Sequence, residues 1–295
     1  MRLPEWVKAS YPSSSVLELK KLLRKGGLHT VCEEARCPNM GRCFSRPSAA
    51  FMIMGAVCTR NCGFCSVESG RSAAGGAAGL GPLSDDEPAR LAAAARAMAL
   101  KYVVITSVTR DDIEDGGASH FASCVRALKS ELPAVKVEVL TPDFGGSRRA
   151  LESVLAAGPD VFNHNVETVP RLYPVVRPQA DYERSLKILE WASERGQRAS
   201  AEGGIPVKSG FMLGLGERPE EVMTVMEDLR ASGCVMLTIG QYLRPSSKSL
   251  PVFEYIRPER FDELRIAALA MGFKSVASGP LVRSSMNAEE YYRHV

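Results

Sequence analysis

Beyond residue 98 the chain alternates short apolar runs with amphipathic segments, and this pattern limits the possible folds more than any other feature. It predicts strands at 102–108, 136–141, 161–167, 209–216, 235–243 and 273–278, with an earlier strand at 50–55. Helical spacing separates them, as where Phe121, Val125 and Leu128 recur at i, i+4 and i+7. Regular alternation of this kind forms right-handed βαβ units and a parallel sheet. We therefore expect an α/β fold, and about seven strands favour a partial or full barrel over an open doubly wound sheet.

Composition restricts the function classes. Of the 295 residues, 45% are hydrophobic, which is enough for a sizeable core. The 37 basic and 34 acidic residues are well mixed, which argues against a nucleic-acid-binding tail or a polybasic membrane anchor. The chain has no apolar run of membrane-spanning length, and its start lacks a signal-peptide profile. We expect a cytoplasmic protein with neither a nucleic-acid nor a membrane partner.

The cysteines are concentrated near the amino terminus. Six of the eight, Cys32, Cys37, Cys43, Cys58, Cys62 and Cys65, lie within 34 residues. In a cytoplasmic chain such a set indicates metal or catalytic use more than disulfides. Cys124 and Cys234 lie in apolar helical patterns, so we expect them to be buried packing residues.

The stretch "CTRNCGFC" (58–65) has a C-x3-C-x2-C spacing and directly follows the first predicted strand. Active sites of barrels gather at this carboxyl edge of the strands. Structural zinc sites use four ligands, whereas three thiolates can hold a four-iron, four-sulfur cluster and leave one iron open to a small molecule. A zinc knot or a plain electron-transfer cluster is the alternative.

A second set, Cys32, Cys37 and Cys43, has a C-x4-C-x5-C spacing. Pro38 and Gly41 break any helix here, so the thiolates can surround a compact group. A cluster bound there could be a structural element, an electron relay or a sulfur store, and the residues alone leave all three open.

These motifs resemble those of the radical S-adenosylmethionine (SAM) superfamily and, along nearly the whole chain, those of its lipoyl synthase family. The stretches that carry the resemblance are "LHTVCEEARCPNMGRC", "CTRNCGFC", "DDIEDGGASHFA", "NHNVETVPRLYPVVRP", "KSGFMLGLGE", "TIGQYLRPS" and "GPLVRSS". The family pattern differs at Met286, where tyrosine is usual, at Thr109, where aspartate is usual, and near residue 75, where residues look inserted.

The resemblance implies a partial (βα)6-type TIM-like parallel barrel with extensions at both ends. Residues 1–49 would be an N-terminal extension with the auxiliary-cluster cysteines, 50–272 the radical SAM barrel, and 273–295 a C-terminal extension with the "RSS" motif. Cys58, Cys62 and Cys65 would hold the cluster that cleaves SAM. Cys32, Cys37, Cys43 and Ser285 would hold an auxiliary [4Fe-4S] cluster, and Ser285 suits a corner that must open because an alkoxide binds iron more weakly than a thiolate does.

The activity implied is insertion of two sulfur atoms at carbons six and eight of a protein-bound octanoyl-lysine, with sulfur from the sacrificed auxiliary cluster. Two [4Fe-4S] clusters and SAM are the implied cofactors. The implied partners are octanoylated lipoyl-carrier domains or proteins, an electron donor and an iron–sulfur cluster carrier. The alternatives are another two-cluster sulfur-inserting enzyme of the methylthiotransferase kind and a non-catalytic zinc protein.

Candidate SAM contacts follow from position and from the resemblance. They are Phe64, Asn163, Glu167, Arg177 and Lys208. Asn163, Asn165 and Glu167 alternate along a predicted strand, so we expect them to share one face. A polar barrel layer that binds no ligand is the alternative for this group, and Lys208 could instead pair with an acidic neighbour.

Overall fold

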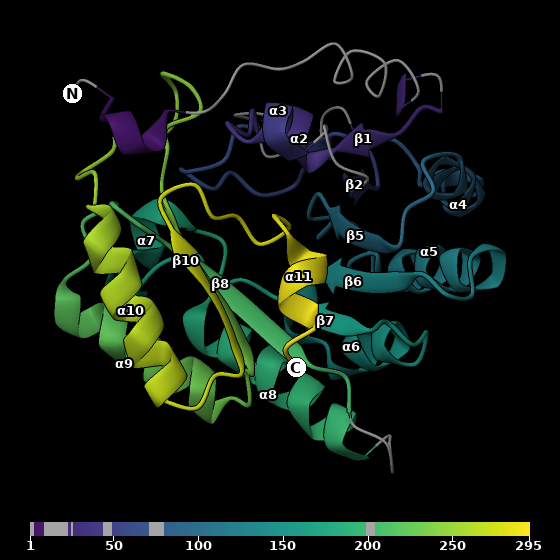
Figure 1. Ribbon diagram of the computed structural model, residues 1–295. Helices are drawn as coiled ribbons and strands as arrows, with labels where there is room; N and C mark the ends of the chain where they lie inside the picture. The colour runs from purple at the N-terminus through teal and green to yellow at the C-terminus, as the bar shows by residue number, and fades with distance from the viewer. Residues whose placement is uncertain (1–2, 9–22, 25, 44–48, 71–79, 199–203) are drawn as a thin grey trace. The chain divides into compact units, whose positions relative to one another are not determined.

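The computed structural model describes residues 3–8, 23–24, 26–43, 49–70, 80–198 and 204–295 (Figure 1). The chain divides into two compact units. The amino-terminal unit contains residues 10–61 and 66–161, and the carboxy-terminal unit contains residues 1–9, 62–65 and 162–295. The sequence also predicts a short amphipathic helix at 16–27, and most of this segment lies outside the described residues, as does half of the glycine- and alanine-rich stretch at 69–86, residues 71–79.

The amino-terminal unit is built on strands in the order β1 (His29–Thr30), β2 (Ala49–Ile53), β5 (Tyr102–Ser107) and β6 (Lys136–Leu140). β1 runs antiparallel to β2, whereas β2, β5 and β6 are parallel. Every residue of β2 is buried, as expected for parallel strands covered on both faces. Helices α4 (Glu87–Ala97), α5 (Ala118–Glu131) and α6 (Arg148–Leu155) pack side by side in chain order (Figure 1).

The carboxy-terminal unit contains the parallel strands β7 (Val161–Asn163), β8 (Val207–Leu213), β9 (Met236–Gln241) and β10 (Ser275–Gly279), of which the first residue of β7 still belongs to the other unit. Its longer helices are α8 (Tyr182–Arg198), α9 (Pro219–Ala231) and α10 (Pro258–Ala270). Shorter helices are α7 (Tyr173–Val176) and α11 (Ala288–Tyr292). α8 packs on β8, and α10 packs on β10.

Short elements complete the two units. They are the 3-10 helices η1 (Glu5–Val7), η2 (Phe144–Gly146) and η3 (Pro170–Leu172), the helices α2 (Val31–Glu34) and α3 (Met40–Cys43), and the strands β3 (Val57–Cys58) and β4 (Glu68–Ser69). β3 and β4 pair with each other, which the sequence did not predict.

The α/β class and the parallel strands are confirmed, and every predicted strand has a counterpart. The strand predicted at 161–167 is wrong in length, because regular pairing ends at Asn163. Glu167 has a φ of 65°, in the left-handed region, and joins the sheet only as an isolated bridge to Phe211. Cys124 and Cys234 are fully buried, as predicted.

A buried polar network ties the end of β2 to α4 and α5. The Glu87 carboxylate accepts a hydrogen bond from the Met54 main-chain N–H at 3.0 Å and lies 2.6 Å from His120 Nε2. Glu87 is only 4% exposed, so its carboxylate depends on these partners in place of water.

Replacing Glu87 with alanine is expected to lower the free energy of unfolding by about 3–5 kcal/mol, because it leaves His120 and the Met54 N–H buried without their acceptor. Urea denaturation followed by circular dichroism measures this. The matched control is Glu131→Ala, whose exposed ion pair with Arg96 contributes about 0–1 kcal/mol. Equal losses in the two variants would contradict a stabilising role for the Glu87 network.

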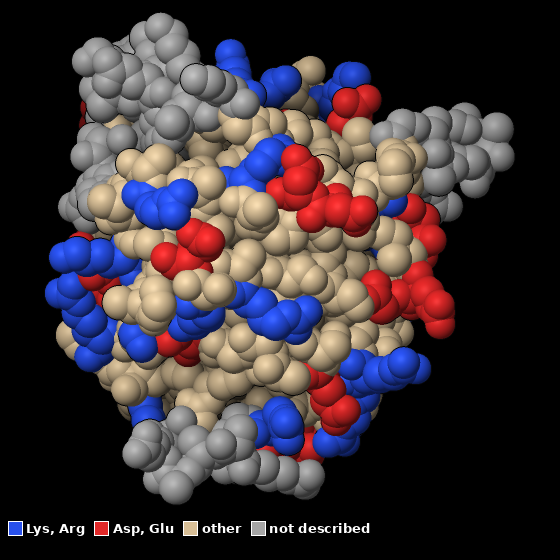
Figure 2. Space-filling view, turned by 90° about the vertical axis from the view of Figure 1, so that its right-hand side faces the viewer, with Lys and Arg blue, Asp and Glu red and all other residues tan. Residues whose placement is uncertain are grey.

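The described surface agrees with the mixed composition. On the face drawn in Figure 2, basic and acidic side chains are interspersed and form no single-sign field. Within the described ranges, no helix combines the length and the apolar character required to span a bilayer.

Candidate functional site

The first half of the cysteine loop belongs to the amino-terminal unit. Cys58 is the last residue of β3, and its carbonyl accepts from the Gly70 N–H at 2.9 Å. Its sulfur accepts two main-chain hydrogen bonds, from Arg60 N at 3.4 Å and from Thr109 N at 3.3 Å. Thr59 reinforces the second contact, because its N–H and its hydroxyl both donate to the Thr109 carbonyl. The loop therefore presents Cys58 as a hydrogen-bonded sulfur beside the end of β5.

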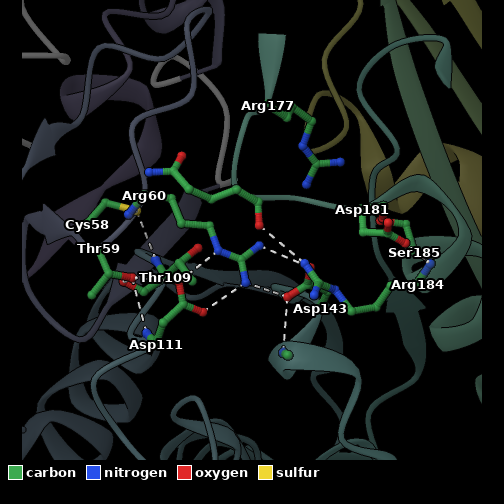
Figure 3. A network of polar contacts seen from close by, with 12 residues as sticks. Cys58, Thr59, Arg60, Thr109, Asp111, Asp143, Arg177, Asp181, Arg184 and Ser185 are labelled. Carbon is green, nitrogen blue, oxygen red and sulfur yellow. Dashed lines mark hydrogen bonds and ion pairs between the residues drawn. The ribbon is translucent and has the colours of Figure 1, made fainter. Parts of the chain in front are cut away.

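The Arg60 side chain links this half of the loop to two carboxylates (Figure 3). Nε and Nη2 each lie 2.8 Å from an oxygen of Asp111, and Nη1 and Nη2 lie 3.0 and 2.6 Å from the oxygens of Asp143. Burial alone would lower the pKa of Arg60, but the hydrogen bonds to both carboxylates more than offset it and hold the pKa above its usual value. The guanidinium is therefore a permanent positive charge in a buried position.

The second half of the loop belongs to the carboxy-terminal unit. The Gly63 N–H donates to the Val176 carbonyl at 2.9 Å, and the Leu250 N–H donates to the Gly63 carbonyl at 2.8 Å. A Cβ at Gly63 would lie 2.8 Å from a methyl carbon of Leu250 and 3.1 Å from the Val175 carbonyl. A side chain at this position would require Leu250 to move, so glycine permits the close approach of the loop to α7 and to Leu250. Phe64 is half-buried, and its contact with the adenine of SAM stays a prediction.

The second cysteine set packs together in the amino-terminal unit. Cys32 is 5% exposed on α2, and Cys37 and Cys43 pack against it. Burial, and then the neighbouring charges of Cys37 and Cys43, raise the pKa of Cys32 well above its usual value. Three thiols held this close repel one another once ionised, so a positively charged group of iron ions fits their chemistry.

Within the described residues, no three His, Cys, Asp or Glu side chains are arranged to hold one metal ion. A [4Fe-4S] cluster makes a different demand, because each thiolate binds a separate iron and the sulfurs need not converge on one point. Each of the two cysteine sets provides three thiols, which is the residue type and number that such a cluster requires when its fourth iron takes another ligand.

The two serines of the "RSS" motif have different environments. The Ser284 hydroxyl lies within hydrogen-bonding distance of Asn165, at 2.9 Å from Nδ2, and of Thr238, at 3.1 Å from Oγ1. Its carbonyl accepts from Lys208 Nζ at 2.6 Å. Ser285 is half-buried, and no group in the described part of the chain forms a hydrogen bond with its hydroxyl. The structure thus gives hydrogen-bond partners to the hydroxyl of the first serine, and the ligand role of the second serine stays a prediction.

Close approach of the main chain shapes the same region. A Cβ at Gly210 would lie 2.2 Å from Thr238 Oγ1 and 2.9 Å from the Thr238 carbonyl. Glycine at this position of β8 therefore leaves room for the hydroxyl that contacts Ser284.

The predicted SAM contacts of the carboxy-terminal unit fall into two groups. Glu167 accepts from Asn165 Nδ2 at 3.1 Å, and Arg177 Nη1 donates to the carbonyls of Asn165 and Val166, both at 3.1 Å. Asn163 and Lys208 are register partners in β7 and β8, and both are buried. Lys208 donates to the Ser284 carbonyl, and its two predicted roles, contact with SAM or pairing with an acidic neighbour, stay predictions.

Burial raises the pKa of Glu167, while the charges of Arg177 and Arg283 and the hydrogen bond from Asn165 oppose that rise. Together with its left-handed φ, this makes Glu167 an unusually constrained carboxylate. Such backbone strain concentrates at ligand-binding positions.

Arg60 and Asp143 were not predicted from the sequence as parts of the site. One signal was present, because Asp143 follows the strand β6 and carboxyl ends of parallel strands gather functional groups. The departure at Thr109 has a structural explanation. Its contacts with Cys58 and Thr59 use main-chain atoms, so they do not depend on which side chain stands there.

Comparison with known proteins shows the family. The model of the radical SAM superfamily matches residues 52–229, and the model of the N-terminal domain of lipoyl synthase matches residues 1–37. The lipoyl synthase of Syntrophotalea carbinolica is 56% identical over 288 residues, covering 97% of this chain and 89% of the relative. The lipoyl synthase of Photorhabdus laumondii is 52% identical over 294 residues, covering 98% and 87%.

Solved structures agree in fold. Methylornithine synthase matches with a TM-score of 0.59 and 14% identity, covering 90% of this chain and 76% of that one. HydG, a maturase of the [FeFe]-hydrogenase, matches with a TM-score of 0.58 and 14% identity, covering 77% and 50%. At this identity the likeness shows the fold alone, which is the partial TIM barrel that the resemblance implied.

The chain belongs to the radical SAM superfamily. Within that superfamily it belongs to the lipoyl synthase family, whose members are sulfur-inserting enzymes that use SAM and two [4Fe-4S] clusters on an octanoylated lipoyl carrier. The enzyme class and the cofactor set predicted from the sequence are thereby confirmed. The alternatives of a methylthiotransferase-like enzyme and a zinc protein lose their support.

Proposed function

We propose that this chain inserts two sulfur atoms, at carbons six and eight, into an octanoyl group carried on a lysine of a lipoyl-carrier domain. The observation that carries the proposal is the pair of separate three-cysteine sets, one with a hydrogen-bonded sulfur at Cys58 and one packed around Cys32. Membership of the lipoyl synthase family supports it.

In this proposal Cys58, Cys62 and Cys65 hold the radical SAM cluster. When bound there, the cluster and SAM supply the 5′-deoxyadenosyl radical, since unactivated C–H bonds offer no acid–base handle to side chains. The chain's own residues position the reactants. Phe64 packs beside the adenine, and Asn163, Glu167, Arg177 and Lys208 contact the polar groups of SAM.

The proposed role of Glu167 is to accept hydrogen bonds from hydroxyl or amino groups of SAM. Its raised pKa and its position beside Asn165 and Arg177 support this role, because a carboxylate shielded from water forms stronger hydrogen bonds with a ligand. Arg177 already orders the chain by donating to the carbonyls of Asn165 and Val166, and its positive charge balances Glu167.

In this proposal Cys32, Cys37, Cys43 and Ser285 would hold the auxiliary cluster, whose sulfide would be the source of the inserted sulfur. The contrast between the engaged Ser284 hydroxyl and the Ser285 hydroxyl supports the choice of the second serine. An alkoxide is a harder and weaker ligand for iron than a thiolate is, so Ser285 would hold its iron less firmly than the three cysteines hold theirs.

The proposal also includes an electron donor for the first cluster, an iron–sulfur cluster carrier that rebuilds the second, and a cytoplasmic location. All eight cysteines are free thiols, as a reducing compartment requires. The three-part division at residues 49 and 272 stays a prediction.

The test is an anaerobic reaction of reconstituted protein with SAM, a strong reductant and an octanoyl-lysyl peptide, analysed by mass spectrometry. We expect a peptide that has gained two sulfur atoms, together with 5′-deoxyadenosine. Omission of the reductant is the control and should abolish both products. Formation of 5′-deoxyadenosine without any sulfur-containing peptide would contradict the proposed substrate or the auxiliary-cluster assignment.

A further inference from the structure

The sulfur of Cys58 is the point where two distant segments of the amino-terminal unit meet. Of its two main-chain N–H donors, Arg60 lies 2 residues from Cys58 along the chain and Thr109 lies 51 residues from it. Their main chains must hold one relative position for both donors to reach the same sulfur. The two hydrogen bonds from Thr59 to the Thr109 carbonyl hold part of that position, and a further constraint comes from a side chain of the loop.

The Arg60 side chain supplies that constraint. It is 6% exposed and spans two carboxylates, of which Asp143 is fully buried and Asp111 is 43% exposed. Asp111 in turn donates its main-chain N–H to Thr59 Oγ1 at 3.1 Å, next to Arg60. Asp143 is held by its own turn, because its carboxylate accepts from Gly145 N at 3.1 Å. The guanidinium thus connects the cysteine loop to the segments that follow β5 and β6 (Figure 3).

We propose that Arg60 is a positioning residue for the radical SAM cluster: by bridging Asp111 and Asp143 it keeps both main-chain N–H groups on the Cys58 sulfur and thereby raises the cluster's reduction potential. Reduction adds negative charge to the cluster, and hydrogen bonds to its sulfurs stabilise that charge. The inference rests on the proposed assignment of Cys58 to this cluster.

Arginine is required because the role is geometric as well as electrostatic. A guanidinium offers a planar fork that can pair bidentately with two carboxylates at once, whereas a lysine ammonium is a compact point charge. Arg60→Lys therefore keeps the charge and removes the bridge. The pair of variants Arg60→Lys and Asp111→Asn separates positioning from charge.

The experiment measures the reduction potential of the radical SAM cluster by electron paramagnetic resonance during a redox titration. The full chain carries alanine at Cys32, Cys37 and Cys43, so only one cluster contributes to the signal. In Arg60→Lys we expect the equilibrium constant for one-electron reduction to fall at least tenfold, which corresponds to about 59 mV towards more negative potential. Arg96→Lys, at an exposed ion pair of the same unit, is the matched control and should leave the potential unchanged.

For Asp111→Asn, a pure charge effect and a loss of the Arg60 bridge predict changes of opposite sign in the reduction potential. Removal of a negative charge near the cluster would by itself make reduction easier, whereas loss of the bridge makes it harder. We expect the potential to become more negative. A potential that is unchanged or more positive in Asp111→Asn, or unchanged in Arg60→Lys, would overturn the inference.

Two other outcomes of the cluster-loading measurement also have a defined meaning. If Arg60→Lys does not retain iron, Asp111→Asn alone decides, because it leaves the Arg60–Asp143 pair in place. If the protein with Arg60 intact binds no cluster, or if Cys58→Ala does not change its loading, the proposed function fails and not merely this inference.

Discussion

Replacing Cys62 with alanine is expected to reduce 5′-deoxyadenosine formation to background while the auxiliary cluster stays loaded. The radical site has only three protein ligands, so loss of one leaves two thiolates to hold four irons. The effect should exceed the roughly 10–100-fold loss typical of removing a supporting group around a metal site. Iron and sulfide analysis of the anaerobic protein, followed by a SAM cleavage assay without peptide, measures both parts of the prediction.

Cys234→Ala is the matched control for this experiment. Cys234 is fully buried, and burial raises the pKa of its thiol, so it stays protonated and serves only in packing. Iron content and SAM cleavage should match those of the unsubstituted protein. If Cys62→Ala cleaved SAM as well as the control does, the assignment of the C-x3-C-x2-C loop to the radical cluster would be wrong.

Replacing Ser285 with alanine is expected to separate the two halves of the reaction. SAM cleavage should continue, because Cys58, Cys62 and Cys65 are untouched. Sulfur insertion should fall by about 10–100-fold, the scale of losing one group that tunes a metal site. Mass spectrometry of the peptide and the nucleoside in one reaction gives the ratio directly.

Ser284→Ala provides the contrast on the neighbouring residue. Its hydroxyl contacts Asn165 and Thr238, so its loss should cost about 1–3 kcal/mol of folding stability while insertion continues. Thermal unfolding and the same peptide assay test this. The ligand assignment would have to move from Ser285 to Ser284 if insertion were lost in Ser284→Ala and kept in Ser285→Ala.

The fold was predictable because its signals are local. Strands such as β2 and β5 are buried along almost their whole length, so they stand in the sequence as uninterrupted apolar runs. The helix Pro258–Ala270 was predictable from its first-turn proline and from Gly272, whose φ is 94°. The end of β7 could not be predicted, because a glutamate such as Glu167 gives no indication of a left-handed conformation.

The site was predictable only where its chemistry is contained in one short stretch. Cysteine spacing identifies both ligand sets within a few residues of chain. The partners of Arg60 lie 51 and 83 residues away, and only the tertiary fold selects them among many exposed carboxylates. The different environments of Ser284 and Ser285 likewise depend on contacts with Asn165 and Thr238, more than 45 residues away.

In the carboxy-terminal segment from Gly279 to Ser285, the number of residues determines where the serine lies. Main-chain atoms hold this segment at several points: the Pro280 carbonyl accepts from Gln241 N, the Val282 N–H donates to Gly279, and the Ser284 carbonyl accepts from Lys208. Side chains can therefore vary, as the buried Met286 does where the family usually has tyrosine. One residue more or less between Gly279 and Ser285 would displace the serine by about 3.3–3.6 Å, more than a metal–ligand bond. The number of residues between Gly279 and Ser285, more than the side chains between them, therefore sets where Ser285 lies.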